Sequence, residues 1–160
     1  MRIVSDSGPI LSFARAHRLD ILHEVVRELV IPDAVYEEVV IQGAGKPGSH
    51  EVEQASWIKR EQVRDHTFVA QLPQKLHIGE RQAITLAREL GGVLLVDEHE
   101  VRKEAQRMGV RHFGSLRVLK EAKDRKIIQE VKPILNELVA AGMSISDTLY
   151  QDFLREIGEG

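Results

Sequence analysis

Two acidic residues follow short aliphatic runs and precede helical stretches, which is an arrangement that can bind a divalent cation. Asp6 comes after Ile3 and Val4, and Asp97 comes after the aliphatic run at residues 93–96. In open α/β sheets, ligands bind beyond the carboxyl ends of the strands, where both acids would lie. Carboxylate oxygens are preferred ligands of Mg²⁺ and Mn²⁺. We therefore expect Asp6 and Asp97 to belong to one metal-binding group.

Asp6 also has a purely structural interpretation as a helix N-cap. Asp and Ser side chains accept backbone N–H bonds at helix starts, and Pro9 suits a first helical turn. The two roles are compatible, because Ser5 or Ser7 could cap the helix while Asp6 faces a metal ion.

Two glutamates are expected to join the aspartates from neighbouring helices. Projected at 100° per residue, Glu38 falls between Ala34 and Val35 inside an apolar stripe, whereas Glu37 points to solvent. An unpaired carboxylate is costly among apolar neighbours, which marks Glu38 as a site residue. Glu80 likewise falls on the apolar side of its helix, although the helix dipole alone also favours an acid in a first turn.

The elements that must position these acids alternate along the chain. Strands are expected at Ile3 and Val4, Val30 and Ile31, Trp57 and Ile58, and residues 93–96 and 110–113, with helices between and after them. No structure is assigned to residues 65–73. This alternation predicts a single α/β domain over residues 1–160, a three-layer α/β/α sandwich around a mostly parallel sheet.

Composition and charge narrow the class of protein. The 160 residues include 42% hydrophobic and 29% charged residues and no cysteine, which excludes disulfides and thiolate chemistry. No apolar run is long enough to span a membrane and no secretory signal is evident, so we expect a cytoplasmic protein. Residues 101–126 hold nine basic and three acidic residues, a net +6 in a chain of net −3. Such a stretch could bind a polyanion, or could form a solvated helical face.

Five segments in order resemble the PIN-domain family of metal-dependent nucleases, in particular a VapC-like toxin–antitoxin branch. They occupy residues 3–10, 31–39, 77–84, 94–98 and 114–119. The resemblance implies an endoribonuclease that depends on Mg²⁺ or Mn²⁺, acts on RNA, forms a homodimer and pairs with a small antitoxin protein.

The resemblance also assigns roles to individual residues. Asp6 matches the first family acid and Glu38 the second, Glu80 stands where many members carry Asp, and the fourth acid is Asp97 or, alternatively, Glu98. Further substrate or metal-water contacts are expected at strand-to-helix turns and beside them: Ser7, Ser115 and Arg117. Arg102 would lie near the mouth of the site or pair with Glu98 at i+4.

Two other functions remain to be separated from catalysis. The departure at Glu80 and Asp97 is compatible with a PIN-like module that binds RNA or protein without cleaving. A receiver-like phosphoacceptor also uses strand-end acids, but it needs a lysine at a late strand end, and residues 110–113 end without one.

Overall fold

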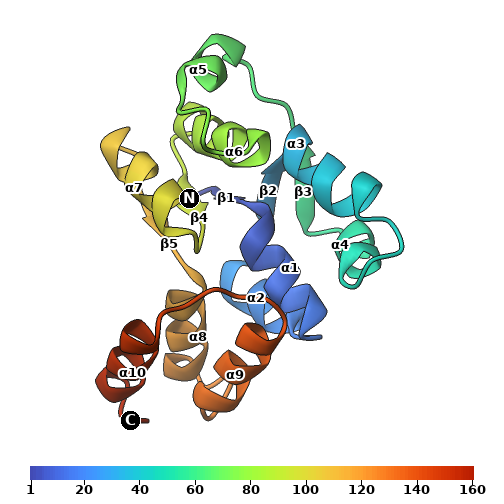
Figure 1. Cartoon of the computed structure of the whole chain (residues 1–160). Coiled ribbons are helices and arrows are strands. Elements are labelled where there is room, and N and C mark those ends of the chain that lie inside the picture. Colours follow the sequence, from blue (N-terminus) through green and yellow to red (C-terminus); the bar gives the residue numbers. More distant parts are fainter.

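Five short strands form an all-parallel sheet, and its three inner strands are built mainly from aliphatic residues. The computed structural model describes every residue from 1 to 160. The strands are β1 (Ile3–Ser5), β2 (Leu29–Pro32), β3 (Ile58–Glu61), β4 (Val93–Leu95) and β5 (His112–Phe113). Their order is β3-β2-β1-β4-β5, so β1 is central (Figure 1). Ser5 of β1 lies opposite Leu95 of β4, and the Asp6 amide extends this ladder by donating to the Leu95 carbonyl oxygen at 3.2 Å. The register therefore brings the residues after β1 and β4 to the same edge.

Helices connect the strands and cover the sheet. The helices before β4 are α1 (Ser7–Arg15), α2 (Leu19–Val26), α3 (Asp33–Tyr36), the π-helix η1 (Glu37–Gln42), α4 (Ser49–Gln54), α5 (His66–Gln71) and α6 (Ile78–Glu89). Those after β4 are α7 (His99–Arg107), α8 (Ser115–Asp124), α9 (Lys132–Ala140) and α10 (Asp147–Glu156).

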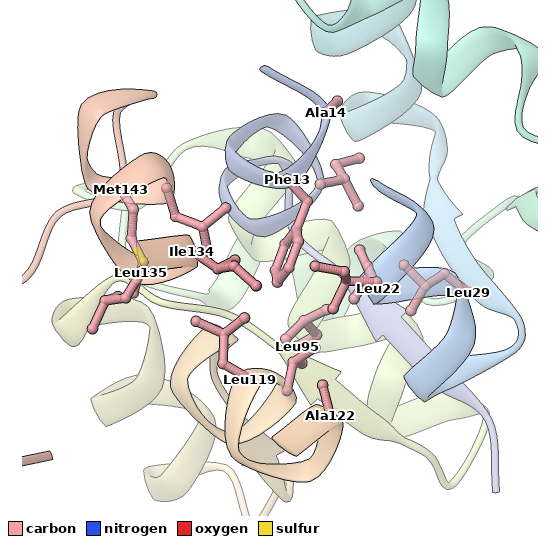
Figure 2. Close-up of a cluster of buried hydrophobic side chains, with 14 of the residues drawn as sticks. Phe13, Ala14, Leu22, Leu29, Leu95, Leu119, Ala122, Ile134, Leu135 and Met143 are labelled. Carbon is pink, nitrogen blue, oxygen red and sulfur yellow. The ribbon is translucent and has the colours of Figure 1, made fainter. Parts of the chain in front are cut away.

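Alternate strand residues enter two separate hydrophobic cores, one on each face of the sheet. Leu29, Ile31 and Leu95 pack into the core formed with α1, α2, α8 and α9, part of which is drawn in Figure 2. Val30 and Leu94 pack into the other core, beneath α5, α6 and α7. Figure 1 shows these two groups of helices on opposite sides of the sheet. This arrangement confirms the predicted three-layer α/β/α sandwich with a parallel sheet.

Helix α5 lies in the stretch for which the sequence predicted no structure. Its N-cap Asp65 accepts a hydrogen bond from the Phe68 amide at 2.9 Å. Glu89, at the end of α6, accepts hydrogen bonds from the Arg64 and Asp65 amides. The guanidinium of Arg88 lies 4.1 Å from the centre of the Phe68 ring. Contacts from a distant helix thus stabilise α5, which is why a local pattern did not reveal it.

None of the helices combines the length and apolar character needed to cross a membrane.

Candidate active site

Asp6 lies at the carboxyl end of the central strand and is almost completely buried. Its residue is 3% exposed, and its Oδ1 accepts a hydrogen bond from the Ser7 amide at 2.7 Å. Asp6 is therefore the N-cap of α1, as the structural interpretation of the sequence proposed. No protein group donates to its Oδ2. The cap thus uses one carboxylate oxygen and leaves the other available.

Glu38 reaches the same region from η1 but lies at the surface. Its Oε2 accepts a hydrogen bond from the Ser7 hydroxyl at 3.0 Å. The expectation that Glu38 sits buried within an apolar stripe was wrong, since the residue is exposed. The projection assumed a regular α-helix, whereas residues 37–42 form a π-helix with wider turns. Glu37 is exposed as expected and lies 3.6 Å from the Arg60 guanidinium.

Helix α6 approaches Glu38 closely at Gly79. A Cβ atom there would lie 3.4 Å from both Glu38 Oε1 and Val35 Cγ2, at the near limit of an ordinary van der Waals contact. The next residue, Glu80, is half-buried, and its Oε1 accepts a hydrogen bond from the His77 amide at 2.8 Å as part of a capping box. Glu80 is nevertheless close enough to Asp6 to influence its pKa. Glu80 thus caps the start of α6, and its negative charge also raises the pKa of Asp6.

Asp97 follows β4 and is held by a serine from another turn. Its Oδ1 accepts from the Ser115 amide at 2.7 Å, and its Oδ2 accepts from the Ser115 hydroxyl at 2.6 Å. Ser115 is completely buried, so its polar groups act on Asp97 and not on solvent. A Cβ atom at Gly114 would lie 2.8 Å from Asp97 Oδ1. Glycine at position 114 is therefore what permits this close approach.

A small cavity joins the strand-end acids. It has a volume of about 200 Å³, and its lining includes Asp6, Ser7, Glu38, Asp97 and Glu98. Glu98, which is exposed, is thus brought to the site alongside Asp97, whereas Glu80 is outside the lining. Both candidates for the fourth acid are present.

The cavity is closed on one side by the connection between α9 and α10, which Figure 1 shows as a long arc. Ala141, Gly142, Met143 and Ser144 of this connection contribute to the lining. Arg15 of α1 contributes as well, and it donates a hydrogen bond to the Pro47 carbonyl oxygen at 3.2 Å. The sequence did not identify these residues, because a loop more than 130 residues beyond Asp6 carries no local signal of its position.

The electrostatics of the site disfavour ionised Asp6. Its pKa is raised to about 7, mainly by burial and also by the nearby negative charges of Glu80, Glu38 and Glu98, while the hydrogen bond from the Ser7 amide opposes the shift. Burial also raises the pKa of Asp97, but the Ser115 hydrogen bonds and the Arg102 charge oppose that shift. No cation offsets the acids around Asp6 in the way that Arg102 does at Asp97.

This charge pattern suits a divalent cation, although the side chains do not form a finished metal site. No three acidic or histidine side chains lie close enough together to form one. Mg²⁺ is commonly held by one or two carboxylates and keeps several waters. Asp6 and Glu38, which share contacts with Ser7, are the residues that would hold such an ion, with Asp97 and Glu98 facing it across the cavity.

The basic residues of α8, within the basic stretch at residues 101–126, have different partners. Lys123 donates to Glu159 at 2.8 Å and to the Ile157 carbonyl oxygen, so it attaches the C-terminus. Lys120 donates to Asp124 at 2.9 Å. Arg117 forms no ion pair and lies over the Phe113 ring. Arg102 lies beside Asp97 and not in an ion pair with Glu98. Arg102 and Arg117 therefore remain available to an external anion.

The largest cavity of the molecule is elsewhere. It measures about 800 Å³ and includes Ile3 and Val93, the first residues of β1 and β4, in its lining. It thus lies at the amino ends of the strands, with Glu121 as its one carboxylate. The acid cavity is smaller but holds the residues that could perform chemistry.

Comparison with known proteins agrees with this geometry. Residues 2–159 match the model of the family DUF3368, described as a PIN domain. A solved PilT N-terminus domain protein from the hyperthermophilic archaeon Sulfolobus solfataricus is 15% identical, with a TM-score of 0.51 over 91% of this chain and 98% of that one, which is a likeness of fold. No curated protein matches the sequence. PIN domains are generally metal-dependent nucleases. Since the family model covers nearly every residue, the chain belongs to the PIN-domain family.

Proposed function

We propose that the protein is a metal-dependent endoribonuclease that hydrolyses RNA phosphodiester bonds with Mg²⁺ or Mn²⁺. The observation that carries this proposal is Asp6: a buried carboxylate at a strand end, with one free oxygen and a pKa that three nearby glutamates help to raise. A group with a strongly perturbed pKa in a cleft is a candidate for function. A bound divalent ion would make Asp6 ionise readily and would supply the positive charge that the protein lacks there.

The residues of the cavity would divide the work of the reaction. Asp6 and Glu38 would hold the ion, and the Ser7 hydroxyl would orient Glu38 by its hydrogen bond. Ser115 would fix Asp97 at the other side, next to Glu98. When bound, such an ion lowers the pKa of a coordinated water and stabilises charge on the leaving oxygen.

The test is cleavage of labelled RNA by the purified chain with Mg²⁺, with Mn²⁺ and with EDTA. We expect cleavage with a metal only, and its loss in Asp6→Asn, which preserves the size of the side chain and the Ser7 cap. The matched control is Asp20→Asn, an exposed acid in the first turn of α2, which should cleave like the wild type. Cleavage that persists in Asp6→Asn would refute the assignment.

The biological role that we propose is the toxin of a toxin–antitoxin pair of the VapC-like kind, acting as a cytoplasmic homodimer. The proposal rests on membership of the PIN-domain family and on the order of the five sequence segments. Expression of the wild type, but not of Asp6→Asn, should arrest growth, and a small protein encoded beside it should relieve the arrest. Sedimentation analysis of the purified chain tests the dimer.

A second candidate is a PIN-like module that binds RNA or protein without cleavage. It is favoured by the hydrogen bonds that occupy both oxygens of Asp97 and one oxygen of Glu80. Calorimetric titration with Mn²⁺ separates the two candidates. Binding that is lost in Asp6→Asn and in Glu38→Gln argues against this second function, whereas no binding by the wild type supports it.

A further inference from the structure

A second cavity adjoins the acid cavity beyond Asp97. It has a volume of about 340 Å³, and it shares Asp97, Met143 and Ser144 with the acid cavity. The two spaces thus meet along the connection between α9 and α10. A ligand that spans them would have one part at the acids and the other in this second cavity.

Two arginines line the second cavity without forming an ion pair, although the charge of Arg102 acts on the nearby Asp97. Arg102 and Arg117 are both in its lining, and neither takes part in any ion pair or side-chain hydrogen bond. Lys120 also lines it but is bound to Asp124. The acids of the lining are Asp97, whose oxygens are occupied by Ser115, and Glu156. Unpaired guanidinium groups bind phosphate oxygens in a bidentate way.

The remaining wall of this cavity is apolar. Met143, Ile145 and Leu149 come from the α9–α10 connection and from α10, opposite Phe113 of β5. Leu149 is 46% exposed, so its side chain is accessible to a ligand in this cavity. A flat aromatic base could pack against these apolar side chains, whereas a free phosphate would gain no favourable contact with them.

We infer that this cavity is a nucleotide subsite, in which Arg102 and Arg117 bind a phosphate of the RNA next to the one at the acids and the apolar wall receives a base. The inference rests on the proposed nuclease function for the identity of the ligand. The volume of the second cavity is near the lower limit for pockets that bind a drug-sized ligand. A base that enters such a cavity must be unpaired, so the inference requires RNA that is single-stranded beside the cleaved bond.

The experiment measures binding and not cleavage. A fluorescent single-stranded RNA octamer is titrated with the full-length Asp6→Asn chain in EDTA, and its anisotropy is followed at several salt concentrations. Arg102→Gln and Arg117→Gln should each weaken binding about tenfold or more. Each should also reduce the slope of log K against log salt by about 0.7, the value for one lost phosphate contact on a single strand.

The chain offers a matched control for Arg117. Arg88 lies over the Phe68 ring as Arg117 lies over the Phe113 ring, but α6 is on the other face of the sheet. Arg88→Gln should leave both affinity and salt slope unchanged. Leu149→Ser should weaken binding of the octamer while an abasic octamer binds both proteins equally, and unlabelled duplex of the same sequence should compete poorly.

The outcomes distinguish the subsite from the nuclease function. If Arg102→Gln and Arg117→Gln bind like Arg88→Gln, or if the duplex competes as well as the single strand, the subsite is refuted even when Asp6-dependent cleavage is present. If the wild type fails to cleave RNA but both arginine variants selectively lose binding, the subsite stands and the nuclease function fails.

Discussion

The turns after β1 and β4 carry the same succession of residues, an aliphatic strand and then an aspartate before a helix, but they surround the aspartate differently. Asp6 receives one hydrogen bond, from the Ser7 amide, and its charged neighbours are Glu38, Glu80 and Glu98. Asp97 receives two hydrogen bonds from Ser115 and lies beside the positive charge of Arg102.

Burial raises the pKa of both aspartates, but only at Asp97 do two hydrogen bonds and a positive charge oppose that rise. Ionising Asp6 costs free energy in this structure unless a cation binds beside it. Substitution of Asp6 is therefore the most direct test of metal binding. The Ser115 hydrogen bonds to Asp97 also connect the end of β4 to the start of α8. A similar sequence pattern thus leaves one carboxylate oxygen without a protein partner at Asp6, whereas both oxygens of Asp97 have one.

The largest expected effect is the cost of the Asp6 charge to stability. With a pKa of about 7 in the folded chain against the usual 3.8, Asp6 keeps a proton when folded that it releases when unfolded. The free energy of unfolding therefore falls as pH rises from about 4 to 7, by up to about 4 kcal/mol. In metal-free buffer, Asp6→Asn should be more stable than the wild type at pH 8 and similar to it at pH 4. Urea denaturation at both values measures this, and equal stabilities at pH 8 would contradict it.

Metal binding should reverse that cost in the wild type. An ion that binds only the folded state stabilises it, by about 2.7 kcal/mol when the concentration of the ion is 100 times its Kd. Mn²⁺ at pH 7.5 should therefore raise the thermal midpoint of the wild type and of Asp20→Asn but not of Asp6→Asn. The effect should decrease below pH 7, since a protonated Asp6 cannot bind the ion. An equal rise in Asp6→Asn would place the ion elsewhere.

Gly114 tests how tightly the Asp97 turn is packed. In Gly114→Ala the new methyl group would lie 2.8 Å from Asp97 Oδ1 and 3.2 Å from the Val96 carbonyl oxygen, so the turn must open. We expect a loss of about 1–3 kcal/mol in the free energy of unfolding. The counterpart at the first turn is Gly8→Ala, where nothing lies within 4 Å of the new Cβ and the helix gains from alanine. Chemical denaturation should show opposite signs for the two variants, and a neutral Gly114→Ala would mean that the turn adapts.

The sequence was sufficient for the parts of this comparison that depend on local pattern. Apolar residues indicated all five strands, aliphatic runs in the three inner ones and shorter apolar signals in β3 and β5, and the rule for parallel sheets placed Asp6 and Asp97 at one edge. The sequence pattern could not distinguish the surroundings of the two aspartates, because the serine that binds Asp97, Ser115, lies 18 residues further along the chain. The π-helix at Glu38 was also hidden, since the projection assumed regular α-helical turns.

Part of the cavity lining could not be predicted either, because it comes from residues that are distant from the acids in the sequence. The α9–α10 connection reaches Asp6 only through tertiary packing, in which Met143 joins the core shown in Figure 2. The apolar spacing of the C-terminal helices predicted that they form but not where they dock.

The smallest effect compares the two serines that serve the aspartate turns. Ser115→Ala removes the hydroxyl that Asp97 Oδ2 accepts within a buried site, and an unsatisfied buried acceptor costs about 1–3 kcal/mol. Ser7→Ala removes only a surface hydrogen bond to Glu38, because the Asp6 cap uses the Ser7 amide, so the cost should stay within about 0.5 kcal/mol. Urea denaturation at pH 7 ranks the two variants. Because Ser115 also lowers the pKa of Asp97, its loss should make stability fall further as pH rises, whereas Ser7→Ala should follow the wild type. Equal losses in the two variants would mean that the Ser115 hydroxyl stabilises Asp97 no more than a surface hydrogen bond stabilises Glu38, and the structural connection from β4 to α8 through Asp97 would be refuted.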